Sequence, residues 1–127
     1  MTVGDQYGGD ITRLAAADLS AATSQYTIMR ATSATQVNIT TAATQAPLGI
    51  LQNRPASGQA AEVRVNSGAT SKAIAGAAVT AGVEVMSDST GRCITATTTN
   101  EVVGIALSSA ANANELIDVL IRPYHKV

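Results

Sequence analysis

The chain has 127 residues, of which 46% are hydrophobic, yet it contains no Trp or Phe and carries a formal net charge of −1. This length fits one domain, whose core has to be built from Val, Ile, Leu and Ala, and so thin a core favours association with other chains. Only 13% of the residues are charged and three are tyrosines, which excludes the basic, aromatic-rich surface of a nucleic-acid-binding protein.

Residues 1–13, MTVGDQYGGDITR, are polar and rich in glycine, with no sustained hydrophobic period. Because such a segment has little apolar surface to bury, we expect a flexible arm that becomes ordered when a partner binds it. The segment has neither a basic n-region nor an apolar h-region, so it is not a secretory signal.

Apolar residues recur at helical spacing between Ile11 and Ala22, and Asp10 or Thr12 is available as a helix cap. The serines and threonines around them suit an extended loop equally well. One short helix and an extended loop therefore remain the two alternatives for this segment.

From Gln25 onward the hydrophobic period changes to two. Tyr26, Ile28 and Arg30 alternate with smaller or polar neighbours, and the pattern resumes around Val37 after a turn of small residues, which predicts a β-hairpin. A second strand-turn-strand unit follows, made of residues 49–53, a polar turn at 55–58, and residues 62–65.

The second half of the chain repeats this plan. A hairpin is predicted from Val83 to Thr95, around the turn Asp88-Ser89-Thr90-Gly91, which has the Asp and Gly that a type I turn prefers. Residues 104–108, a turn at 112–114, and residues 118–121 then repeat the second unit, with Gly104 lying 55 positions after Gly49.

Together these patterns predict an all-β fold: a small antiparallel β-barrel or sandwich, β-tulip-like, built by internal duplication. We expect eight or nine strands in a single β domain, 14–127, with pseudo-repeats at 25–65 and 83–121 and a further short strand at 72–75 between them. The most apolar stretch, 73–83, contains two glycines and is too short to cross a bilayer.

No group of residues indicates catalysis. His125 is the only histidine and lies near the C-terminus, where we expect a solvated side chain, and the single Cys93 is expected to be a small apolar strand residue. One Cys and one His cannot complete a zinc site. Glu62 and Asp118 fall at equivalent places in the two copies, as charges on the solvent face of a sheet would. We therefore expect no enzyme, no metal site and no cofactor.

Gly49 and Gly104 recur at matched positions inside predicted strands. Glycine in a strand marks a bulge, a corner or the close approach of another backbone. Two interpretations stay open: a corner of the barrel, or a place where another subunit or an incoming strand presses against the sheet.

The run Leu48–Ala56, continued by Gly58–Val65, resembles the head decoration, or capsid cement, proteins of tailed bacteriophages. Three further stretches resemble the same family in the same order: Leu19–Ala22, Ala75–Gly82 and Val103–Leu107. The resemblance covers about residues 18–121, and Gly-Ile-Leu-Gln-Asn-x-Pro is its most specific part.

This resemblance implies a non-enzymatic structural protein of the virion, synthesised in the host cytoplasm. It would bind the outside of the expanded capsid as a homotrimer, at threefold and quasi-threefold positions, and clamp neighbouring major capsid subunits. Its partners would be the major capsid protein and other copies of itself, with no nucleic acid and no membrane.

Members of the family often pair an N-terminal arm with capsid strands, and the composition of this arm suits such strand addition. The candidate capsid-binding residues are Val3, Gly4, Asp5, Gln6, Tyr7, Gly8, Gly9 and Asp10, and the candidate subunit contacts are Gly49 and Gly104. The alternative function is a surface-displayed β-barrel that binds glycan or a host surface. We rank it lower because sugar sites rely on aromatic platforms and the chain has three tyrosines.

Overall fold

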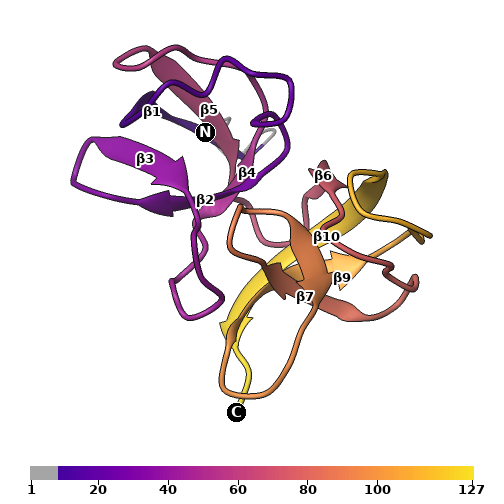
Figure 1. Cartoon of the computed structure of the whole chain (residues 1–127). Helices are drawn as coiled ribbons and strands as arrows, with labels where there is room; N and C mark the ends of the chain where they lie inside the picture. Colours follow the sequence, from indigo (N-terminus) through magenta and orange to yellow (C-terminus); the bar gives the residue numbers. More distant parts are fainter. Residues whose placement is uncertain (1–8) are drawn as a thin grey trace, which may run out of the picture.

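Ten strands and no helix make up residues 9–127, the part of the chain that the computed structural model describes (Figure 1). The first five strands are β1 (Asp10–Ala15), β2 (Ile28–Ala31), β3 (Gln36–Ile39), β4 (Gly49–Leu51) and β5 (Ala60–Arg64). The second five are β6 (Thr70–Ile74), β7 (Glu84–Ser87), β8 (Cys93–Thr95), β9 (Glu101–Ala106) and β10 (Leu116–His125). The all-β prediction is confirmed.

The first five strands form a closed barrel in the order β1-β3-β2-β4-β5. All neighbours are antiparallel except β1 and β3, which run parallel with Ala15 opposite Val37. We call residues 10–64 the first barrel.

The second five strands repeat this arrangement. Their sheet order is β6-β10-β9-β7-β8, and one parallel bridge between Ala75 and Cys93 brings β8 back to β6. The strand pairs of this sheet match those of the strands five places earlier, and the single parallel bridge stands where β1 and β3 pair in the first barrel. We call residues 70–125 the second barrel, and the shared topology is that of an internal duplication.

Backbone hydrogen bonds fix which residues are equivalent in the two barrels. The N–H of Tyr26 donates to the carbonyl of Leu51 at 2.9 Å, and the N–H of Gly82 donates to the carbonyl of Ala106 at 2.7 Å. In the same way Gly58 donates to Ala15 at 2.8 Å, and Asn114 donates to Ala75 at 2.7 Å. Tyr26 is therefore equivalent to Gly82, and Gly58 to Asn114.

The helix considered for residues 11–22 is wrong. Residues 10–15 form β1, and turns and bends follow as far as Tyr26. A short isolated helix is marginal in water, whereas β1 pairs with β5 from Asp10 to Leu14, which satisfies its backbone along one side. Asp10–Arg13, the last four residues of the segment predicted as an arm, lie in β1, and this strand is the one missing from the expected nine.

The two barrels share a core. Leu51, Met29 and Val37 fill the first barrel, while Ile28 and Ile50 of the same barrel are buried in the cluster that fills the second. Three backbone hydrogen bonds cross the junction: Ile28 N–H to Gly91 O at 2.8 Å, Ile74 N–H to Tyr26 O at 3.2 Å, and Glu101 N–H to Ala43 O at 2.8 Å. In Figure 1 the first barrel (indigo to magenta) accordingly packs directly beside the second (orange to yellow).

Candidate functional site

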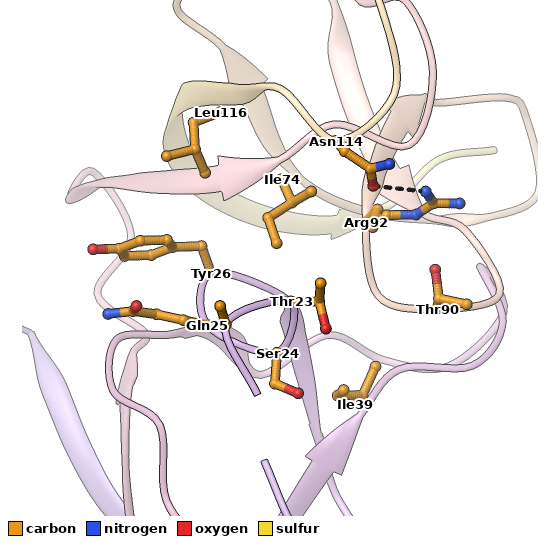
Figure 2. Close-up of a pocket in the computed structure, with 11 residues that line it drawn as sticks. Thr23, Ser24, Gln25, Tyr26, Ile39, Ile74, Thr90, Arg92, Asn114 and Leu116 are labelled. Carbon is orange, nitrogen blue, oxygen red and sulfur yellow. Dashed lines mark hydrogen bonds between the residues drawn. The ribbon is translucent and has the colours of Figure 1, made fainter. Parts of the chain in front are cut away.

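A groove of about 660 Å³ opens where the two barrels meet (Figure 2). The apolar side chains that line it are Ala22, Tyr26, Ile39, Ile74 and Leu116. The polar ones are Thr23, Ser24, Gln25, Thr90, Arg92 and Asn114. Figure 2 shows Tyr26 and Gln25 pointing the same way at one end of the groove, with Arg92 and Asn114 joined at the other. The site thus has a mainly apolar floor and amide or guanidinium groups at its rim.

Two of the lining residues have left-handed backbones, Tyr26 with φ of 69° and Asn114 with φ of 72°. Their equivalents in the other barrel are glycines, Gly82 and Gly58, with φ of 96° and 79°. A side chain at such a position costs free energy that glycine avoids. The fold therefore requires the left-handed conformation at both positions in both barrels. In each of these two pairs, the residue that carries a side chain is the one that lines the groove.

Asp88 holds the polar rim in place. Its carboxylate accepts hydrogen bonds from the backbone N–H of Thr90 at 2.8 Å and of Arg92 at 2.9 Å, and it forms an ion pair with the Arg92 guanidinium at 2.9 Å. Burial acts to raise the pKa of Asp88, but these hydrogen bonds outweigh it, so the pKa lies below its ordinary value. Arg92 then donates to Asn114 Oδ1 at 3.1 Å, which fixes the orientation of both side chains.

The predicted arm falls mostly outside the described residues, including Val3, Gly4, Asp5, Gln6, Tyr7 and Gly8. Gly9 and Asp10 are described, and both are bonded to residues at the end of β5 or just after it. The Gly9 carbonyl accepts from Val65 N–H at 2.7 Å, and Asp10 forms an ion pair with Arg64 at 2.9 Å. Gly9 and Asp10 therefore lie beside the short link between the two barrels, residues 65–69.

Gly49 and Gly104 are both buried, in β4 and β9. A Cβ atom on Gly49 would overlap the carbonyl oxygen of Arg64, and one on Gly104 would overlap that of Leu120. A register shift between Val85 and Met86 also places a bulge beside Gly104. What the two glycines meet in this structure is the neighbouring strand of their own barrel.

The remaining candidates lie apart from the groove. Cys93 is fully buried in β8, as expected, and burial raises the pKa of its thiol to about 12. His125 ends β10 with an exposed side chain that contacts Glu101. Asp118 forms a cross-strand ion pair with Lys72 at 3.1 Å, and the equivalent Glu62 accepts from Thr12 at 2.8 Å, which confirms the predicted charges on the solvent face.

Within residues 9–127 no three His, Cys, Asp or Glu side chains come close enough together to hold a metal ion. No helix in the same range is long and apolar enough to cross a membrane. Sequence reasoning missed the groove, although aligning the two repeats already sets Tyr26 against Gly82 and Asn114 against Gly58.

Two copies of one five-stranded unit, packed through a common core, define a duplicated all-β barrel protein. Comparison with known proteins then identifies its family. The phage cement protein family matches residues 14–122 of the chain. The chain therefore belongs to the phage cement protein family and is a structural protein associated with the phage capsid.

Among solved structures, the head fiber gp8.5 N base of bacteriophage phi29 is similar in fold. The two share 18% sequence identity with a TM-score of 0.66, over 89% of this chain and 92% of that one. No curated protein sequence matches the chain significantly.

Proposed function

We propose that the chain is a head decoration protein that binds the outside of the expanded capsid. It does so as a homotrimer at threefold and quasi-threefold positions, and it stabilises contacts between major capsid subunits. The family match over residues 14–122 is the observation that carries this proposal. The phi29 neighbour, a head fiber base, supports a site on the head because its fold is shared over most of both chains.

The physical character of the chain suits this work. The twin barrel offers a sparsely charged surface, so many modest contacts can form without a large desolvation cost. A trimer that bridges several capsid subunits then raises the effective concentration of each contact, and weak contacts become a durable clamp. A lone, buried cysteine agrees with synthesis in the reducing cytoplasm of a host.

The N-terminal arm is proposed to add as a strand to the major capsid protein. Its sequence supports this because backbone pairing needs few particular side chains. The structure sets the boundary for a test: residues 2–8 can be deleted, whereas Gly9 and Asp10 hold Val65 and Arg64.

The proposal is tested by binding of purified protein to expanded capsids and to unexpanded precursors of the same phage. We expect saturable binding to the expanded form, little binding to the precursor, and weaker binding after deletion of residues 2–8 with no change in melting temperature. Equal binding to both particles would contradict the mechanism, and unchanged affinity of the deletion variant would remove the arm from it.

The groove favours a second candidate function, recognition of a glycan or host surface by a capsid-displayed barrel. Tyr26 supplies an aromatic face, and Gln25 and Asn114 supply amides at the same groove, which is a combination that sugar sites use. A glycan array probed with the chain and with a Tyr26→Gly variant tests it. Binding that the substitution abolishes would support this function, and a blank array would exclude it.

A further inference from the structure

We infer that the junction between the two barrels of one chain is repeated between chains. The outer side of β1 in one copy, where Leu14 is exposed, would pack on the β9–β10 sheet of the second barrel of another copy. This contact would join neighbouring chains of the proposed trimer, and the number of chains rests on that proposal. Its evidence is the duplication itself, because the junction inside the chain shows how one barrel docks on another.

Inside the chain, β6 of the second barrel docks on the first barrel through three contacts. Ile74 N–H donates to Tyr26 O at 3.2 Å, Gln52 Nε2 donates to Ser71 Oγ at 2.8 Å, and Arg64 donates to the Thr70 carbonyl at 3.1 Å. Ile74 is only 8% exposed as a result. The edge of β6 is thus covered by the preceding barrel.

The equivalent edge in the first barrel is β1, which no barrel precedes in the described residues. Leu14 is equivalent to Ile74, since Leu14 lies opposite Ala60 as Ile74 lies opposite Leu116. Leu14 is 43% exposed, whereas Ile74 is buried. It borders a notch of about 270 Å³ beside Ala34 and Thr35. We call Leu14, Ala34 and Thr35 the edge face.

The second barrel carries the matching partner surface. Leu107 is equivalent to Gln52, because Gln52 N–H donates to Glu62 O at 2.8 Å and Leu107 N–H donates to Asp118 O at 2.7 Å. Leu107 is 49% exposed. Its neighbours there are Gly82, in the place of Tyr26, and the half-buried Ile105 and Leu120. We call Gly82, Ile105, Leu107 and Leu120 the sheet face.

Each face carries an exposed leucine at a position where the junction inside the chain has a different kind of residue. Leu107 stands in the place of the polar Gln52, and Leu14 stands in the place of the buried Ile74. The hydrogen-bonded pair Gln52 and Ser71 corresponds to Leu107 and Ile11, and Ile11 is half-buried against the core of its own barrel. A copy of the junction between chains would therefore have apolar side chains in place of that hydrogen bond.

Contiguous exposed apolar surface marks contact sites, and on the sheet face the exposed Leu107 adjoins the half-buried Ile105 and Leu120. Leu14 and Leu107 are equivalent to residues on the two opposite sides of the junction inside the chain. This points to a second copy of the chain as the occupant.

Two differences set the character of this contact. The seam of the first barrel is already closed by the hydrogen bond from Leu14 N–H to Thr35 O, so the contact would be made by side chains. Glu84, equivalent to Ile28, is already covered by Tyr124 and Lys126, which limits the sheet face on that side. Because the faces differ, the contact is head-to-tail, and it closes into a ring when the rotation permits. A ring of three chains would present six barrels.

A thiol cross-linking experiment tests the pairing directly. One protein carries Leu14→Cys and another carries Leu107→Cys, and the two are mixed and treated with a short bismaleimide. The native Cys93 stays silent because it is fully buried. Thr98→Cys, exposed on the loop after β8, replaces either variant as the matched control.

We expect dimers that contain one chain of each kind, at a yield several-fold above that of the Thr98→Cys mixtures. Yields equal to the control, or a majority of dimers between identical variants, would overturn the inference. In a second measurement, Leu107→Gln imports the residue of the other barrel and is expected to lower the sedimentation mass, while Leu116→Ala leaves it unchanged. Cross-linking between positions 14 and 107 without capsid binding would refute the capsid proposal alone.

Discussion

Tyr26 of the first barrel occupies the position that Gly82 occupies in the second, and both residues have a left-handed backbone. Tyr26 donates a backbone hydrogen bond to Leu51 in β4, and Gly82 donates the equivalent bond to Ala106 in β9, so the fold demands this conformation in both copies. Only in the first copy does a side chain use the position, and the ring packs against the shared core and lines the groove.

Replacing Tyr26 separates the effect of the ring from that of the backbone. We expect Tyr26→Gly to be more stable than Tyr26→Ala by about 1 kcal/mol, because glycine removes the left-handed strain and alanine keeps it. Chemical denaturation measures the difference. Gly82→Ala is the control, since a Cβ there meets no other atom within 4 Å, and it should show the backbone cost alone.

Gly49→Ala and Gly104→Ala should each lower the free energy of unfolding by about 1–3 kcal/mol, because the added methyl group forces β4 or β9 away from its neighbour. Gly58→Asn, which imports the residue of the equivalent Asn114, should change stability by less than about 1 kcal/mol. Thermal unfolding of the three variants checks the order. If both glycine-to-alanine variants are as stable as the parent, the neighbouring strands can move apart at these points without a measurable cost in stability.

Gly91→Ala should weaken the junction between the barrels. Its Cβ would lie 2.6 Å from Ile39 Cγ2 and 3.2 Å from Thr27 Cβ, on a backbone with φ of 78°. Hydrogen exchange of the Ile28 amide, which donates to Gly91 O, should accelerate more than exchange inside either barrel. Gly68→Ala has a similar φ of 93° but open space around it, so it should leave that amide protected.

Asp88 should contribute to stability at neutral pH and lose that contribution in acid. Its folded pKa lies below the ordinary value of 3.8, so folding favours the ionised carboxylate. The stabilisation is complete above the ordinary value and disappears as the pH falls through the lowered folded pKa. Asp88→Asn should therefore reduce stability at pH near 7 and flatten the acid side of the stability profile. Parallel profiles for variant and parent would contradict this.

Cys93 should not react with maleimide in the folded protein at neutral pH. Burial raises the pKa of its thiol to about 12, so the reactive thiolate is scarce and also inaccessible. Mass spectrometry should detect labelling only under denaturing conditions. Rapid labelling of the native chain would mean that β8 opens readily.

The sequence was sufficient for most of the fold, because local signals agree with the final sheet. Alternation around Tyr26 and the Asp88 to Gly91 turn each specify a hairpin without help from distant residues. β1 was missed for a physical reason: its strand character depends on pairing with β5, about fifty residues away, and its burial is too slight to leave an alternating pattern.

The candidate site was less accessible to sequence reasoning. The groove arises from packing one barrel on the other, and no local pattern around Ile74 or Leu116 reports that contact. The repeat does contain usable information, since Leu107 against Gln52 and Tyr26 against Gly82 are mismatches in an otherwise parallel plan. Such mismatches between copies mark where each barrel meets a different neighbour.

The three backbone hydrogen bonds across the junction also have a mechanical consequence. Tension applied to one barrel reaches the other through Ile28 and Gly91, Ile74 and Tyr26, and Glu101 and Ala43, as well as through the five-residue link at 65–69. A load on the two barrels is therefore shared among three hydrogen bonds and the covalent link. The junction stays stiff until the hydrogen bonds break together.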